Sequence, residues 1–295
     1  MIERVTIRRF KKFQDITVNL PGHVVIAGPN NTGKSTVLQA IAAWDLALNR
    51  WKQKNDFQFH KGGYAKVPIA RQAFSAVPLR AFDLLWRDRT YSGSIEIEIR
   101  HAAGWAITME FIADSTEQVY VRPKNDASPS VVRSANIQAV YVPPMSGLGT
   151  EEPVYQLPKV NHLLGQSKPG EVLRNLLVLA HHTAAWDVLL ESISRLFHYE
   201  LIPPDSSGAH IIAEYRSRPG GPTFDIASAG SGFQQVLMLL TFLHTHPGAV
   251  LLLDEPDAHL HVILQDAIYG ELRSVAAKRG SQLIIATHSE VIIDS

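Results

Sequence analysis

The sequence predicts an α/β protein with a parallel core sheet, an antiparallel β subdomain and an inserted helical lobe. Three apolar runs support this prediction, because the strands of a parallel sheet are covered on both faces and lack a polar face. The runs are HVVIA at 23–27, VLLLD at 250–254 and LIIAT at 283–287. Polar or glycine-rich segments follow each run, and ligands of such sheets bind at the carboxyl ends of the strands. We therefore expect one site where these strands end.

The remaining elements are predicted from hydrophobic periodicity and from turn residues such as Pro21-Gly22. The segment GLGTEEPVYQLPKVNHLLGQSKPG has neither period and is expected to be loop-rich. In chain order, the predicted elements are IERVTIRRFKKFQDITVNLPG (two strands around a basic bend), STVLQAIAAWDLAL (helix), SGSIEIEIRHAAGWAITMEFI (hairpin), TEQVYVRP and NIQAVYVPP (strands), GEVLRNLLVLAHHT and WDVLLESISRLF (helices), HYELIPP and HIIAEYRS (strands), SAGSGFQQVLMLLTFLHTHPG (helix) and a helix ending at Lys278.

We expect a single domain over residues 1–295 with three parts. Residues 1–145 form an N-terminal lobe with the glycine loop and the β subdomain, 146–230 a helical lobe, and 231–295 a return to the core sheet.

Composition bounds the class of protein. With 45% hydrophobic and 19% charged residues, the chain has the make-up of an ordinary globular protein. The formal net charge is zero, so no global attraction to nucleic acid or acidic membranes is expected. Cysteine is absent, which excludes disulfides and thiolate metal sites. Because MIERVTIRRF lacks the apolar core of a secretory signal and no run has the length of a membrane span, we expect a cytoplasmic protein without membrane contact.

The stretch GPNNTGKST, residues 28–36, has the spacing G-x-x-x-x-G-K-S of a phosphate-binding loop, or P-loop. In such a loop the backbone N–H groups and the start of the next helix point at phosphates, and glycines allow the tight curvature. Lys34 would neutralise the outer phosphates during catalysis, and the hydroxyl of Ser35 would ligate Mg²⁺. The alternative is a fortuitous glycine turn before a helix. The predicted nucleotide-binding residues here are Asn30, Asn31, Thr32, Gly33, Lys34, Ser35 and Thr36.

Acidic residues and a histidine end the other two core strands. Asp254 is the candidate partner of the magnesium ion, and Glu255 is placed to act as general base on an attacking water. His288 ends the last strand, beside Asp254, where it can hydrogen-bond the γ-phosphate or that water. The alternatives are an acidic strand-to-turn junction broken by Pro256, and a structural histidine.

A second small-residue loop, SAGSGFQQ at 228–235, precedes a predicted helix. The N–H groups of such a loop could bind an anionic oxygen at the helix start. The alternative is a simple N-cap by Ser228 or Ser231.

These four elements, in this order, resemble the ATP-binding-cassette (ABC) superfamily of ATPases. MIERVTIRRFKKFQ is similar to the start of its chromosome-maintenance and recombination branch, and GSGFQQ, DEPDAHLH and ATHS look most like the overcoming-lysogenisation-defect (OLD) family and related phage-defence ATPases. The resemblance implies that Ser231 and Gly232 contact the γ-phosphate of a nucleotide held by a partner subunit. It also matches Asp257 to an acid at the dimer seam, and His261 to the histidine of an L-H-P segment.

The chain departs from the family pattern at several positions. GSGFQQ replaces L-S-G-G-Q, so either serine could act, and Val262 stands where proline is usual. The family's Q-loop glutamine is left open between Gln138 and Gln156. The divergent signature argues against a transporter, and the lack of long charged heptads argues against a chromosome-maintenance head.

The resemblance implies ATP and Mg²⁺ as ligands and a homodimer or higher homo-oligomer as the active form. OLD-type proteins continue into a nuclease, whereas this sequence runs only seven residues past His288. We therefore expect ATP hydrolysis to switch a phage-defence or DNA-transaction complex whose nuclease-like effector is separate or lies in a longer chain. Two alternatives stay open: a nucleotide-locked scaffold with negligible turnover, and a repair ATPase stimulated by DNA.

Two further patterns leave the partner open. From Arg50 to Arg89, nine basic residues against three acidic ones alternate with aromatic residues. Such interleaving could contact nucleic acid or could form a partly packed surface lobe. Arg8, Arg9, Lys11 and Lys12 form a second basic cluster with the same two interpretations. Histidine pairs such as His259 and His261 lack carboxylates at ligand spacing, so we predict no metal site from them.

Overall fold

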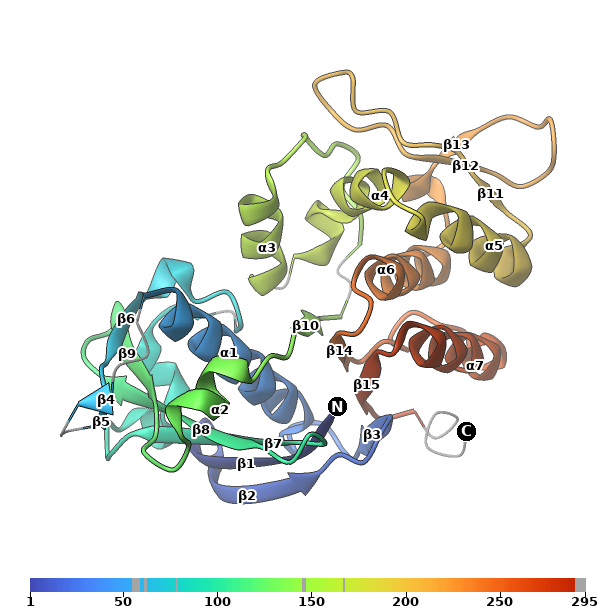
Figure 1. The fold of residues 1–295 in the computed structure, drawn as a ribbon. Helices are drawn as coiled ribbons and strands as arrows, with labels where there is room; N and C mark the ends of the chain where they lie inside the picture. The colour runs from blue at the N-terminus through green and yellow to red at the C-terminus, as the bar shows by residue number, and fades with distance from the viewer. Residues whose placement is uncertain (55–58, 61–62, 78, 145–146, 167, 290–295) are drawn as a thin grey trace.

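The computed structural model describes residues 1–54, 59–60, 63–77, 79–144, 147–166 and 168–289 (Figure 1). A parallel sheet of order β10-β14-β15-β3 forms its centre, and an antiparallel sheet of order β2-β1-β7-β8-β9-β6 lies beside it. The predicted α/β fold class is confirmed. The strands are β1 (Ile2–Phe10), β2 (Phe13–Asn19), β3 (Val24–Ala27), β4 (Phe59–His60), β5 (Gly63–Tyr64), β6 (Val67–Ala70), β7 (Ile95–His101), β8 (Ala106–Ala113), β9 (Gln118–Pro123), β10 (Ala139–Val142), β11 (Glu200–Leu201), β12 (Glu214–Arg216), β13 (Phe224–Asp225), β14 (Val250–Asp254) and β15 (Gln282–Thr287).

Helices cover both faces of the parallel sheet. Figure 1 shows α1 along the antiparallel sheet and α6 and α7 on the far side of β14 and β15. The α-helices are α1 (Lys34–Lys54), α2 (Pro129–Ser134), α3 (Leu157–Gly165), α4 (Leu173–His181), α5 (Ala185–Phe197), α6 (Ser231–Thr245) and α7 (Val262–Arg279). Among the described residues, no helix combines the length and the apolar character needed to cross a membrane.

The position of β14 between two apolar clusters explains why its sequence is apolar without interruption. Val250 and Leu252 belong to the apolar cluster that contains α1, whereas Leu251 and Leu253 belong to the cluster of the helical lobe. Successive side chains of a strand point to opposite faces, so a strand between two cores needs apolar residues at every position. The sheet thereby joins the two clusters.

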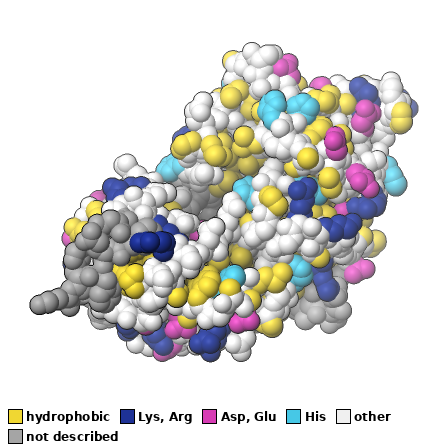
Figure 2. Space-filling model, viewed as in Figure 1, with side chains coloured by type: hydrophobic (Ala, Val, Ile, Leu, Met, Phe, Trp, Pro, Cys, Tyr) yellow, Lys and Arg dark blue, Asp and Glu magenta, His cyan; other side chains and the backbone are white. Residues whose placement is uncertain are grey.

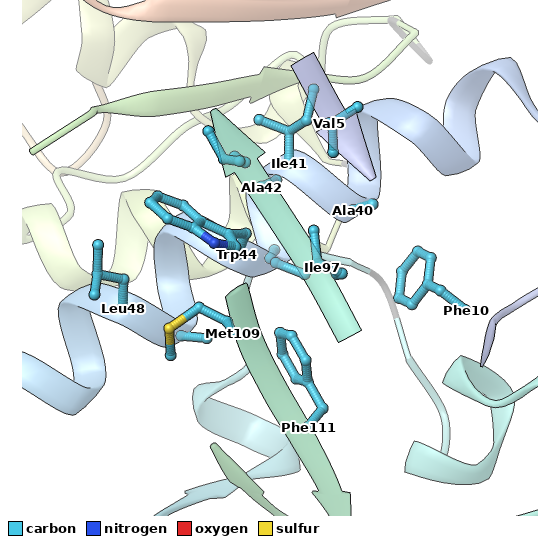
Figure 3. Packing of buried hydrophobic residues seen from close by; sticks show 14 of the residues in the cluster. Val5, Phe10, Ala40, Ile41, Ala42, Trp44, Leu48, Ile97, Met109 and Phe111 are labelled. Atoms are coloured by element: carbon cyan, nitrogen blue, oxygen red, sulfur yellow. The ribbon is translucent and has the colours of Figure 1, made fainter. Parts of the chain in front are cut away.

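The first cluster packs α1 onto the antiparallel sheet. Trp44 is fully buried and its indole N–H donates to the carbonyl oxygen of Ile107 at 2.9 Å. Figure 3 shows Trp44 beside Ile97 and Met109 of the hairpin strands. Gln282 fixes the two sheets to each other, since its side-chain amide accepts from the backbone N–H of Ile2 and donates to the Ile2 carbonyl.

Five of the interleaved aromatic residues of 50–89 are core residues. They have exposed fractions of 4% or less, so an interpretation as stacking platforms for nucleic acid is wrong for these side chains. Phe57 and the side chain of Phe59 lie outside the described residues. On the face in Figure 2, lysine and arginine side chains are spread among acidic ones instead of forming one basic patch. The five buried residues are Trp51, Tyr64, Phe74, Phe82 and Trp86.

The helical lobe contains one element that periodicity missed. Helix α3 lies in the segment expected to be loop-rich, and Pro158 occupies its first turn, where a missing N–H costs nothing. The expected strands after α5 form only the short sheet β11-β12-β13. The predicted helices α4, α5, α6 and α7 are all present.

Candidate nucleotide site

The loop between β3 and α1 adopts a conformation that requires its glycines. Gly28 and Gly33 have φ of +152° and +106°. A Cβ atom on Gly33 would lie 2.5 Å from the ring of Phe13, so only glycine fits there. The Lys34 ammonium is buried and donates to the carbonyl oxygens of Gly28 (2.7 Å) and Pro29 (3.0 Å). The loop therefore wraps the lysine at its centre.

A pocket of about 460 Å³ opens over this loop. Six predicted loop residues line it, together with Glu255 and Lys12. Thr32 does not line the pocket, because its hydroxyl donates to the carbonyl oxygen of Pro29 at 2.9 Å and closes the loop. Lys12 was predicted only as part of a basic cluster, and its ammonium donates to the carbonyl oxygen of Asn31. The six loop residues are Asn30, Asn31, Gly33, Lys34, Ser35 and Thr36.

Asp254 lies at the end of β14, directly beside the start of α1. The hydroxyl of Ser35 donates to its Oδ1 at 2.8 Å, and the hydroxyl of Tyr141 donates to its Oδ2 at 2.7 Å. Burial raises the pKa of Asp254, and these two hydrogen bonds oppose the rise. Hard oxygen ligands of this kind suit Mg²⁺, so the pair Ser35 and Asp254 fits the predicted metal site.

Glu255 and His288 extend from neighbouring strands over the same site. Glu255 has φ of +46°, which is strained for a residue with a side chain, and its N–H donates to the carbonyl oxygen of Ala286 at 2.8 Å. The Nδ1 atom of His288 lies 3.7 Å from Oε1 of Glu255. Their side chains are 52% and 32% exposed. Both groups are open to solvent, as an acid–base pair acting on water must be.

The second small-residue loop, residues 228–235, does not form the N-cap by Ser228 or Ser231 that was the alternative interpretation. Gly230 is the N-cap of α6 and no side chain accepts there, while the Ser228 hydroxyl donates to the carbonyl oxygen of Asp225 at 2.6 Å. A serine N-cap is therefore wrong for this helix. Ser231 and Gly232 do not line the P-loop pocket of their own chain.

The segment after Glu255 packs against this loop. A Cβ on Gly232 would lie 3.2 Å from the carbonyl oxygen of His259, so the two backbones are in close contact. Asp257 is only 6% exposed and accepts from the Thr287 hydroxyl at 2.6 Å, so its carboxylate faces the chain interior and not a seam. His261 caps α7 by accepting from the N–H of Ile263.

Comparisons with known proteins agree with this geometry. Residues 1–130 match a family described as "AAA ATPase domain", and residues 148–294 match one described as "AAA domain, putative AbiEii toxin, Type IV TA system". The two matches support an ATPase. No curated protein matches the ATPase by sequence.

Solved structures show the same fold. The ATPase is similar to the SMC head domain from Thermotoga maritima, with 16% identity and a TM-score of 0.51. It is also similar to an Smc head domain with an extended coiled coil bound to the C-terminal domain of ScpA, derived from Pyrococcus furiosus, with 12% identity and a TM-score of 0.54. Each similarity covers 99% of the ATPase and 91% of the other chain. At such identities the likeness is one of fold.

Two residues of the site escaped prediction for a physical reason. Tyr141 lies on β10, more than 100 residues before Asp254 in the sequence. Lys12 lies at the turn between β1 and β2, ahead of the P-loop. Neither belongs to a motif, since each reaches the site only because its strand pairs or packs there. A prediction that β10 pairs in parallel with β14 would have placed Tyr141 near the site, because Tyr141 lies opposite Leu252 in that pair.

Proposed function

We propose that the ATPase binds ATP with Mg²⁺ at the P-loop pocket and hydrolyses it there. The observation that supports this most directly is that the segments after β3 and β14 meet: Ser35 bonds to Asp254, and Glu255 lines the same pocket. Ser35 and Asp254 would hold the metal ion, which neutralises charge on the β- and γ-phosphates when bound. Lys34 would exchange its hydrogen bonds to two carbonyl oxygens for hydrogen bonds to the phosphate oxygens, which are stronger because both partners are charged.

The chemistry of the site is a proton transfer coupled to phosphoryl transfer. Glu255 accepts a proton from water as the water oxygen bonds to the γ-phosphorus, and the bond from that phosphorus to the β–γ bridging oxygen breaks. ADP and phosphate leave. His288, 3.7 Å from Glu255, would donate to the γ-phosphate or orient the water.

The second half of the site would come from a second copy. Ser231 and Gly232 do not line the pocket of their own chain, which supports the proposal that they contact the γ-phosphate of a nucleotide held by another subunit. Beside them, α7 begins with apolar side chains that are 55%, 77% and 41% exposed at Val262, Ile263 and Leu264. Such a patch is typical of a surface that another protein covers. These features support a head-to-tail homodimer formed with ATP.

The dimer would act as a switch. The resemblance to OLD-like ATPases and the family description that names a toxin of a type IV TA system support a role in phage defence, in which ATP controls a separate, nuclease-like effector in the cytoplasm. A DNA-transaction complex would use the same cycle with DNA as trigger.

The test is ATP turnover by wild type and Glu255→Gln, each with and without double-stranded DNA. We expect the variant to bind ATP but to lose turnover by about 10²–10⁴-fold, because general-base catalysis contributes that much. Stimulation by DNA would favour the repair function over defence. If both proteins bind ATP and neither turns it over, the chain is a nucleotide-locked scaffold and the proposal fails.

A further inference from the structure

Both carboxylate oxygens of Asp254 are held by hydroxyl groups, and one of the two donors has no assigned role. Ser35 bonds to Oδ1 and is a candidate metal ligand itself. Tyr141 bonds to Oδ2 at 2.7 Å from the opposite side, from the neighbouring strand β10. A carboxylate anchored through one oxygen keeps the other in a fixed direction, so the Tyr141 hydroxyl determines where Oδ1 points.

The Tyr141 hydroxyl is itself supported. The side-chain amide of Gln39, one turn after Ser35 on α1, donates to it at 3.4 Å, and the ammonium of Lys11 donates to the Gln39 carbonyl oxygen at 2.5 Å. Every donor in this row faces the same way, from Lys11 to Asp254. Hydrogen bonds aligned in series polarise one another, so the positive charge of Lys11 strengthens the last bond.

The row also crosses the junction of the molecule. Lys11 belongs to the β1–β2 turn, Gln39 to α1, Tyr141 to β10 and Asp254 to β14. The row therefore starts at a turn of the antiparallel sheet, crosses α1 and ends at a carboxylate of the parallel sheet. Tyr141 additionally lines a cavity of about 260 Å³ beside α1 and α3. The ring of Tyr141 is partly buried against the first apolar cluster and its hydroxyl has two hydrogen-bond partners, so it can hold a carboxylate with little residual freedom.

We propose that Tyr141, supported by Gln39 and Lys11, is a positioning residue that orients Asp254 toward the metal ion bound with ATP. This inference rests on the proposed function. When the Ser35 hydroxyl turns from Asp254 to its own metal contact, Tyr141 keeps the carboxylate in place. Groups that orient metal ligands in this way change metal affinity by about 10–100-fold when they are removed.

The test measures metal binding directly. Mn²⁺ is titrated into the full chain with a non-hydrolysable ATP analogue, and free Mn²⁺ is followed by electron paramagnetic resonance. We expect Tyr141→Phe to weaken Mn²⁺ binding about 10–100-fold, with analogue binding in EDTA unchanged. The half-saturating Mg²⁺ concentration for turnover should rise by a similar factor. Tyr120→Phe, on β9 and away from the site, is the matched control and should match wild type.

Gln39→Met gives a second variant that keeps the phenol and its contact with Asp254. It should shift Mn²⁺ affinity in the same direction by a smaller factor, and it serves as the main test if Tyr141→Phe does not fold. If the folded variants bind Mn²⁺ as tightly as wild type, the inference is overturned. It is also overturned if analogue binding in EDTA falls by the same factor as Mn²⁺ binding, because that result indicates a general structural role. If wild type binds neither analogue nor Mn²⁺, the proposed function itself fails.

Discussion

At the scale of single residues, the site is a set of charges and hydroxyls whose partners are already defined. Lys34 donates to the backbone carbonyl oxygens of Gly28 and Pro29, and Ser35 and Tyr141 share Asp254. Glu255 takes a left-handed backbone conformation, a strain that a turn without function would relieve with glycine. Lys34 suits a phosphate, Ser35 and Asp254 suit a metal ion, and Glu255 suits a water molecule.

Lys34→Ala tests the phosphate contact. The variant should lose ATP binding by about 100-fold or more, because a charged hydrogen bond contributes about 1.5–3 kcal/mol and Lys34 would make more than one. Equilibrium titration with ATP measures this loss. Lys278→Ala, which removes an exposed charge at the end of α7, is the control and should bind normally. Unchanged affinity in Lys34→Ala would remove the P-loop assignment.

At the scale of elements, a buried acid joins α1 to β10. Asp45 accepts from the backbone N–H of Ala139 at 3.2 Å and from the Asn49 amide at 3.0 Å. Burial raises its pKa to about 7, against the hydrogen bonds and the charge of Lys52. The strand that delivers Tyr141 to the nucleotide site thus begins at a group whose charge is unfavourable in the folded protein.

Asp45→Asn should therefore change how stability depends on pH. The folded pKa lies above the unfolded value of about 3.9, so the folded state binds more protons between the two values, and wild-type stability falls as pH rises from about 4 to 7. We expect the variant to gain about 1–4 kcal/mol relative to wild type between pH 4 and pH 8. Urea unfolding at several pH values measures it, with the exposed Asp187→Asn as control. A difference that does not vary with pH would contradict the assignment.

At the scale of the whole molecule, two apolar clusters meet across one parallel sheet, and the site lies where that sheet ends. One part of the chain supplies the P-loop pocket and another supplies Ser231 and Gly232, which do not line that pocket. The division at residues 145 and 230 remains a prediction. A complete site requires a second copy in the proposed arrangement.

Ser231→Arg tests that arrangement. The bulky cation at the start of α6 should block ATP-dependent dimerisation while ATP binding by the monomer stays unchanged, because Ser231 lies outside the pocket of its own chain. Sedimentation velocity with and without ATP distinguishes the two forms. Ser217→Arg places the same side chain on another exposed loop and should dimerise like wild type. A Ser231→Arg protein that still dimerises with ATP would exclude this loop from the interface.

The sequence by itself determined the core strands and the residues at their ends. Val250 to Leu253 had to be buried on both faces because they are apolar without a period, and parallel pairing then brings Asp254 and Glu255 beside His288. Local spacing also placed Lys34 and Ser35 at the start of a helix. These features depend on neighbours in sequence or on a single pairing rule.

Only the tertiary structure decided the rest. Tyr141 and Lys12 reach the site through strand pairing and turn packing, which no local pattern specifies. For the same reason, Trp51 and Trp86, which sequence reasoning placed on a possible nucleic-acid surface, lie in the core. Asp257 turned inward because the Thr287 hydroxyl lies beneath it. A side chain's partners are fixed by the packing of distant segments, and that information is not local.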